Sequence, residues 1–342
     1  DTDALLMIKD GKVIYERYFN GMSQNDHHMW FSATKSLTAL AVGVLVDEEK
    51  LNVDALVTEH LPELKGSGYE GVTVQHVLDM SAGLDLHELR ATKYFQNPEG
   101  EPPLEAHYTF AMGFVPHPKL LFGDVTKIGY PGVHGLAGKI SRDSKLKPGD
   151  RFEYQSINTD VLGWLVTSAS GQPLQSFIAD RIWSKIGAEN DGFFTVDSAK
   201  VALASGGFNS TSRDAAKVGL MILNEGKVNN NQVVPTKWIN KLSSGINHED
   251  RRRISITEYA DKGDPAYSPF FEAYKDQWWI IDSAEGAYTM MGLKGQLIYV
   301  NQNSNMVLAL FSSRDLADQN NVLSSAFKNQ LTGLHRFAGS IN

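Results

Sequence analysis

The sequence of 342 residues contains no cysteine. The chain therefore forms no disulfide, no thiolate zinc site and no cysteine nucleophile, and this absence fits a reducing compartment as well as an oxidising one. A chain of this length buries a substantial core without such cross-links, as one large domain or about two of average size.

The sequence also has little clustered positive charge. Lysine and arginine number 32 against 40 acidic residues, which gives a net charge of −8, and the main basic block is Arg251 to Arg253. Nucleic-acid binding needs a clustered positive face, so we expect no nucleic-acid partner. The longest strongly apolar run, Leu37 to Val46, is about half the length of a membrane span and predicts a buried helix.

Several well-known catalytic signatures are absent from the chain. It has no G-x-S-x-G elbow, no H-E-x-x-H zinc motif and no glycine-rich phosphate loop followed by Lys-Ser or Lys-Thr. The adjacent His27 and His28 point in different directions on any regular element, which disfavours a metal site there. We therefore expect no metal and no cofactor.

The first residue of the sequence is Asp1 rather than methionine, and a predicted strand follows almost at once. This start is compatible with the removal of an upstream segment or a signal peptide. Cytoplasmic and exported locations both stay open, and so does the oligomeric state.

Strand patterns occupy both ends of the chain. Residues 4–8 and 12–18 are joined by Asp10-Gly11, a dipeptide suited to the positive φ values of a tight hairpin. Residues 296–300 and 306–311 form a late strand pair. Helical patterns cover residues 32–49, 73–80, 159–168, 174–186, 212–223 and 320–337, and a long irregular stretch covers residues 85–144.

These patterns predict an α+β fold, in which an antiparallel sheet built from both chain ends is flanked by helices and interrupted by an inserted, mainly helical subdomain. We expect an α/β lobe of residues 1–29 and 190–342 and a mainly helical lobe of residues 30–189. A functional site is expected where the lobes meet.

The pattern S-x-x-K occurs three times, at Ser32-Lys35, Ser144-Lys147 and Ser325-Lys328. About one or two matches are expected by chance, so context must decide. The second match lies in a polar loop and the third on an amphipathic terminal helix. Only the first opens a helix that is apolar all round, which predicts a serine and a lysine one turn apart beside the core.

A buried lysine at this spacing has a chemical use. A serine hydroxyl becomes a good nucleophile when a neighbouring base takes its proton, and a lysine in a partly dry site can assist that transfer. Backbone N–H groups at the helix start can stabilise an oxyanion. The alternative, that Ser32 is a helix cap and Lys35 a surface residue, has about equal weight on this segment alone.

Two further segments fit the same chemistry. Tyr154 lies between a Pro-Gly turn and a helix start, where it can face a cleft and share a proton with a serine, although a core tyrosine is the simpler interpretation. Gly292 and Gly295 flank the start of the late strand pair and permit close approach of another backbone or a ligand. A β-bulge is the alternative there.

Taken in order, these segments resemble the serine β-lactamase and penicillin-binding-protein superfamily, in particular its class C-like and esterase branch. Residues 72–84 and 206–214 resemble further segments of that branch, and the pattern is most similar to that of the nylon-oligomer (6-aminohexanoate-dimer) hydrolases. The resemblance implies a β-lactamase/transpeptidase-like fold and a serine hydrolase that acts on small esters or amides through an acyl-enzyme.

The resemblance also implies residue roles. Ser32 would be acylated, Lys35 would assist proton removal, Tyr154 would act as general base and then acid, and the N–H groups of Ser32 and Leu293 would form the oxyanion hole. Further candidates for the substrate pocket are Ser156, Asn158, Ser205, Gly292, Trp278 and Arg90, and an apolar acyl pocket could also include Trp279, Phe114 and Tyr108.

The chain departs from the family pattern at two positions. Alignment on the two glycines places Met290 where K-T-G or H-T-G has its cation; the alternative, Lys294 in that role, would break the glycine spacing. Ser156 stands at the asparagine of Y-x-N. An apolar methionine does not hold the carboxylate of a penicillin, which disfavours that class of substrate. Simple esters are favoured over amides because their better leaving group demands less of the general acid. A β-lactamase or D,D-peptidase, and a catalytically silent binding module, are the alternatives.

Overall fold

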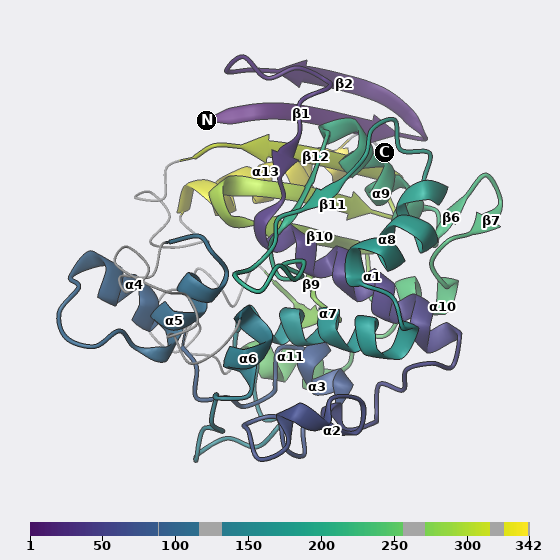
Figure 1. Cartoon of the computed structure of the whole chain (residues 1–342). Coiled ribbons are helices and arrows are strands. Elements are labelled where there is room, and N and C mark those ends of the chain that lie inside the picture. Colours follow the sequence, from purple (N-terminus) through teal and green to yellow (C-terminus); the bar gives the residue numbers. More distant parts are fainter. Residues whose placement is uncertain (88, 116–131, 256–270, 315–324, 341–342) are drawn as a thin grey trace.

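The computed structural model describes residues 1–87, 89–115, 132–255, 271–314 and 325–340 (Figure 1). Its main feature is an antiparallel sheet with the strand order β2-β1-β12-β11-β10-β9-β8. The first strand of the chain pairs with the last described strand, so the two chain ends close the sheet together. This arrangement confirms the predicted α+β fold.

The strands of the large sheet are short to medium in length. They are β1 (Thr2–Lys9), β2 (Lys12–Tyr18), β8 (Ala273–Lys275), β9 (Trp278–Asp282), β10 (Ala287–Gly292), β11 (Gln296–Asn301) and β12 (Met306–Ser312). A small sheet has the order β3-β5-β4, from β3 (His28–Met29), β5 (Phe208–Ser210) and β4 (Phe193–Phe194), and β6 (Lys227–Val228) pairs with β7 (Asn231–Gln232).

The helices lie mostly between β3 and β8 in the sequence. They are α1 (Thr34–Asp47), α2 (Val57–His60), α3 (Val74–Leu78), α4 (Leu89–Gln96), α5 (Leu104–Ala111), α6 (Gly132–Ala137), α7 (Ile157–Ser170), α8 (Leu174–Arg181), α9 (Ser212–Leu223), α10 (Thr236–Asn240), α11 (His248–Ser255) and α13 (Ser325–Ser340). Two 3-10 turns, η1 (Phe31–Ala33) and η6 (Leu293–Gly295), lie next to the proposed site.

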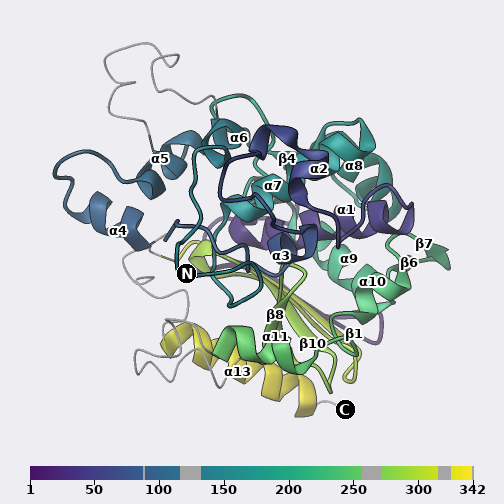
Figure 2. The same ribbon diagram turned by 90° about the horizontal axis from the view of Figure 1, so that it is seen from below.

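The central strands are buried on both faces because helices cover both (Figure 2). Every residue of β11 and β12 is buried, which explains their nearly continuous apolar sequences. One hydrophobic core lies between the sheet and α1, α7 and α9, and the other includes side chains of α13 on the opposite face. Helix α1 runs through the first core, as its apolar sequence predicts.

Several predicted elements match the structure closely, and others need correction. Strand β2 and helix α9 have the predicted bounds, and Asp10 and Gly11 have the positive φ values expected of their hairpin turn. The prediction that residues 85–144 are irregular was wrong, because this stretch contains α4, α5 and α6. Short helices with mixed burial gave too weak a periodic pattern to be recognised there.

Strands β8, β9 and β10 were missed altogether. They precede the predicted late strand pair and extend the sheet by three strands. The β8–β9 hairpin has a two-residue turn at Asp276 and Gln277, both with positive φ. Asp-Gln is not a recognised hairpin dipeptide, whereas Asn-Gly is a strong hairpin signal in a sequence. The predicted helix over residues 320–337 is observed as α13, and its first residues lie outside the described part of the chain.

The division into two lobes at residues 29/30 and 189/190 stays a prediction.

Within the described ranges, no helix has the length and apolar character needed to cross a membrane.

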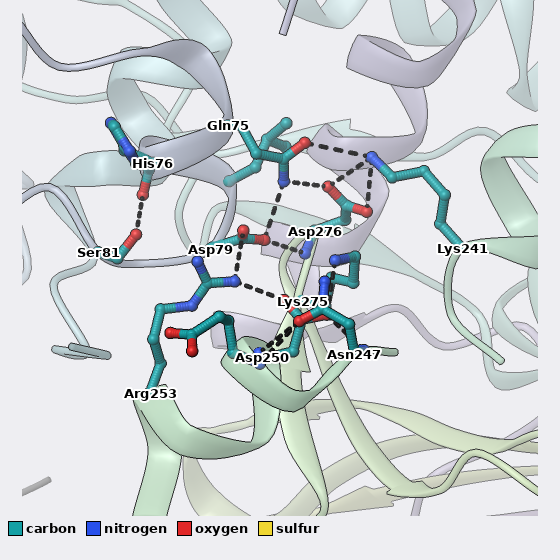
Figure 3. Close-up of polar contacts among 12 residues, drawn as sticks. Gln75, His76, Asp79, Ser81, Lys241, Asn247, Asp250, Arg253, Lys275 and Asp276 are labelled. Carbon is teal, nitrogen blue, oxygen red and sulfur yellow. Dashed lines mark hydrogen bonds and ion pairs between the residues drawn. The ribbon is translucent and has the colours of Figure 1, made fainter. Parts of the chain in front are cut away.

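A buried charged cluster joins the β8–β9 turn to α3, α10 and α11 (Figure 3). Asp79, Asp250 and Asp276 are almost fully buried. Asp276 accepts hydrogen bonds from Lys241 and Gln75. Asp79 accepts from Arg253 and from the N–H of Asp276. Asp250 accepts from Arg253 and Lys275. Three carboxylates thus meet three cations.

Charge balance inside this cluster predicts its response to substitution. Asp250→Asn leaves Arg253 and Lys275 short of a buried counter-charge, and removing one partner of a buried pair costs about 3 kcal/mol or more. We expect a clear fall in the urea midpoint. The neighbouring Glu249→Gln, which alters an exposed pair with Arg252, is the matched control and should leave the midpoint unchanged. Equal shifts in both variants would contradict this account.

Candidate active site

Ser32 lies in η1, immediately before the buried helix α1. The residue before it, Phe31, has a φ of 47°, a left-handed conformation that is unusual for a bulky side chain. Such strain persists only where the surroundings impose it, and it is common at functional sites. No sequence pattern signalled this feature, because phenylalanine has no preference for left-handed backbone.

Lys35 projects from the first turn of α1 toward Ser32, as the S-x-x-K spacing predicts. Its Nζ donates to Ser32 Oγ at 2.9 Å and to the carbonyl oxygen of Ser205 at 2.7 Å. Lys35 is 2% exposed, whereas Ser32 is only partly buried. A reachable hydroxyl therefore contacts a lysine head group that is held almost out of water.

The start of α1 is fixed on the segment of residues 204–208. The Thr38 hydroxyl donates to the carbonyl of Ala204 at 2.9 Å, and the N–H of Phe208 donates to Thr34 Oγ1 at 3.2 Å. Together with the bond from Lys35 to Ser205, these contacts fix α1 at successive turns. Ser205, a candidate from the sequence, therefore contacts Lys35 through its backbone.

Tyr154 lies close to this pair. The Nζ of Lys35 is 5.2 Å from the centroid of its ring, and the ring of Trp279 stacks on it at 5.8 Å with an interplanar angle of 21°. The rings of Phe152, Phe271 and Tyr274 also contact Trp279. Strand β9 therefore orients the tyrosine through Trp279.

Gln277 connects the elements that carry these residues. Its carbonyl oxygen accepts from Ser36 in α1 at 2.7 Å, and its Oε1 accepts from Thr159 in α7 at 2.7 Å. Its Nε2 donates to the carbonyls of Val77 and Leu78 at the end of α3. The left-handed Gln277 thus connects the Lys35 helix to the helix that follows Tyr154, a role that the sequence did not predict.

Gly292 ends β10 against the segment that precedes Ser32. A Cβ at this position would lie 2.1 Å from the carbonyl oxygen of Trp30, so the close backbone approach predicted from the sequence is confirmed. Leu293 follows in η6, and β10 packs against η1. This contact brings the end of β10 beside the Ser32 turn.

Other candidates from the sequence lie elsewhere. Trp278 is fully buried and packs on Tyr288, so it belongs to the core, and Trp279 is the tryptophan that touches Tyr154. Asn158 is also fully buried, with its Oδ1 accepting from Tyr69, and is a core residue rather than a pocket residue. Side chains of adjacent strand residues face opposite ways, which is why one tryptophan replaces the other.

The remaining candidates are placed as follows. Arg90 is half exposed on α4 and pairs with Asp85 and Glu105, and Ser156 is partly buried just before α7. Phe114 is exposed and its ring contacts Phe31, next to Ser32. Tyr108 is buried, and its hydroxyl lies 3.1 Å from Ser205 Oγ.

A family model for the beta-lactamases matches residues 2–326. The chain belongs to the beta-lactamase family. This membership confirms the superfamily resemblance drawn from the motifs, and hydrolases that use an acylated serine are typical of the superfamily.

Relatives of this beta-lactamase-family chain include hydrolases. The 6-aminohexanoate-dimer hydrolase of Paenarthrobacter ureafaciens is 29% identical over 313 residues, which cover 91% of this chain and 72% of that protein. Esterase EstB of Burkholderia gladioli is 27% identical over 176 residues, or 50% of this chain and 40% of that protein. A solved structure from Bacillus anthracis, a candidate 6-aminohexanoate-dimer hydrolase, superposes with a TM-score of 0.80 at 26% identity, covering 99% and 80% of the two chains.

One group in the described part of this beta-lactamase-family chain has metal-ligand spacing. Asp282, Glu285 and His335 are partly buried and lie outside the Ser32 site. Exposed acidic groups commonly have this spacing without a metal, and no second feature of the structure points to an ion there.

The contact at Gly292 predicts a substitution effect. Gly292→Ala must push the end of β10 away from Trp30, and displacements of about 1 Å near a reacting group can cost about a hundredfold in rate. We expect at least a tenfold loss of kcat/KM for an ester substrate. Gly333→Ala, on α13 with open space around its Cβ, is the matched control and should keep wild-type activity. Wild-type kcat/KM in Gly292→Ala would contradict the predicted contact.

Proposed function

We propose that this chain hydrolyses small carboxylic esters, and more slowly simple amides, through an acyl-enzyme at Ser32. The observation that carries the proposal is the 2.9 Å hydrogen bond between Lys35 Nζ and Ser32 Oγ in a nearly dry site. A capping serine and a surface lysine would need no such contact, and a silent binding module would gain nothing from a buried lysine beside an accessible hydroxyl.

In the proposed reaction, Tyr154 takes the proton of Ser32 as Oγ attacks the substrate carbonyl carbon. The ammonium group of Lys35 favours the phenolate of Tyr154 and stabilises charge on Oγ. Tyr154 then returns the proton to the leaving alcohol as the C–O bond breaks. A water molecule then attacks the carbonyl carbon of the acyl-enzyme while Tyr154 takes its proton. Tyr154 returns this proton to Ser32 Oγ as the ester bond to Ser32 breaks, and the acid is released.

The oxyanion of each tetrahedral intermediate would be stabilised by the backbone N–H groups of Ser32 and Leu293. This assignment is supported by the contact between the end of β10 and the segment before Ser32. Donors that are fixed before the reaction lower the barrier because they need no reorganisation when charge develops.

Simple esters are favoured over β-lactams by the environment of Met290. This residue stands at the cation position of the family's K-T-G motif and is fully buried in β10, opposite Ile298. It offers neither charge nor hydrogen bond to the carboxylate of a penicillin. The 6-aminohexanoate-dimer hydrolase and EstB relatives support amide and ester substrates as the two classes to compare.

The proposed nucleophile gives the first test of this function. Purified wild-type protein should hydrolyse p-nitrophenyl acetate with burst kinetics if deacylation is slow, and Ser32→Ala should lose at least about a thousandfold of the activity. Ser144→Ala, which alters a second S-x-x-K match in a loop, is the control and should retain wild-type rates. Equal hydrolysis by Ser32→Ala and wild type would refute the proposal.

The proposed role of Tyr154 predicts a dependence on the leaving group. Tyr154→Phe removes the general acid, whose contribution is about 10² to 10⁴ in rate and is largest for a poor leaving group. The loss of kcat/KM should therefore be greater for an ethyl ester than for the p-nitrophenyl ester of the same acid. A loss of the same size for both esters would show that Tyr154 does not protonate the leaving group.

A further inference from the structure

A buried carboxylate lies behind Lys35. Asp160, in the first turn of α7, is 3% exposed. Its Oδ2 accepts from the Tyr108 hydroxyl at 2.6 Å, and its Oδ1 accepts from the backbone N–H of Ser205 at 2.9 Å. The sequence assigned no role to this aspartate.

Three polar groups of Ser205, its N–H, carbonyl and hydroxyl, are engaged around the site. The N–H of Ser205 donates to Asp160, its carbonyl accepts from Lys35 at 2.7 Å, and its hydroxyl lies 3.1 Å from the Tyr108 hydroxyl. Asp160 therefore fixes the residue whose carbonyl orients the Lys35 head group. Tyr108 braces the same residue from α5.

Asp160 also acts on Lys35 through charge. Burial raises the pKa of Asp160 to about 6, while the hydrogen bond from Tyr108 and the positive charge of Lys35 oppose this rise. Asp160 is consequently ionised above about pH 6 and neutral below it. Charge coupling is reciprocal, so the ionised carboxylate favours the ammonium form of Lys35.

The other titratable groups around Asp160 do not supply a negative charge near neutral pH in its place. Burial and the charge of Asp160 raise the pKa of Tyr69 well above its ordinary value, so Tyr69 stays neutral. His134 of α6 is hydrogen-bonded to the backbone of Asp160, and burial lowers the pKa of its imidazole. Lys35 of α1 and Tyr108 of α5 are the other groups that face the carboxylate.

We propose that Asp160, braced by Tyr108, is a positioning residue that holds the Ser205 carbonyl on Lys35 and keeps the lysine charged for catalysis. This inference rests on the function proposed for Ser32. It predicts that the ionised form of Asp160 is the active form, which a purely structural role at the start of α7 would not require.

The pH dependence of kcat tests the inference. Wild-type kcat for p-nitrophenyl acetate should fall as the pH drops through about 6, because Asp160 then takes a proton. Asp160→Asn should lose about tenfold or more of kcat at pH 7.5 with KM nearly unchanged, and this acid limb should disappear.

Tyr108→Phe provides an independent variant with a directional outcome. Loss of the Tyr108 hydroxyl removes a hydrogen bond that lowers the pKa of Asp160, so the acid limb should move to higher pH. Tyr69→Phe removes another buried phenol hydroxyl, one that bonds Asn158 rather than Asp160, and should leave the limb unmoved. If Asp160→Asn does not fold, Tyr108→Phe against Tyr69→Phe decides the question.

Two outcomes separate this inference from the proposed function. If Ser32→Ala is inactive but Asp160→Asn and Tyr108→Phe keep the wild-type kcat and acid limb, the role of Asp160 is refuted and the serine mechanism stands. If Ser32→Ala keeps wild-type activity, the serine mechanism fails and the role of Asp160 fails with it.

Discussion

The burial of Lys35 is the constraint on which the site depends. A lysine that is 2% exposed must have its head group satisfied by fixed polar partners, since burying an unpaired charge is costly. Ser32 Oγ and the Ser205 carbonyl supply two of them. The need to hold these partners in place explains why so many contacts between distant segments converge at the start of α1.

Both the sheet and the helices hold the polar partners of Lys35 in place. The 204–208 segment fixes one side of α1, and the β8–β9 turn fixes the next residue, Ser36, through Gln277. The same hairpin carries Trp279 onto Tyr154. The buried charged cluster around Asp276 holds the left-handed turn of this hairpin in place. Charge pairs distant from Ser32 therefore contribute to the geometry of the reacting groups.

The sequence predicted the parts that depend on local pattern. Strands at both ends, the Asp10-Gly11 hairpin and helix α9 follow from alternation, turn residues and an apolar stripe. The spacing of Ser32 and Lys35 predicted their contact. The roles of Asp160 and Gln277 and the left-handed conformation of Phe31 were not predicted, because they depend on partners far away in the sequence. Trp278 was preferred to Trp279 because strand β9 itself was missed.

Acylation of Ser32 is open to direct detection by mass spectrometry. The protein is mixed with p-nitrophenyl acetate, quenched in acid within the first turnovers and digested with a protease. We expect an added acetyl mass on the peptide that contains Ser32, and none on that peptide in Ser32→Ala. Turnover of the ester with a transient acetyl group on another residue, and never on Ser32, would contradict the account.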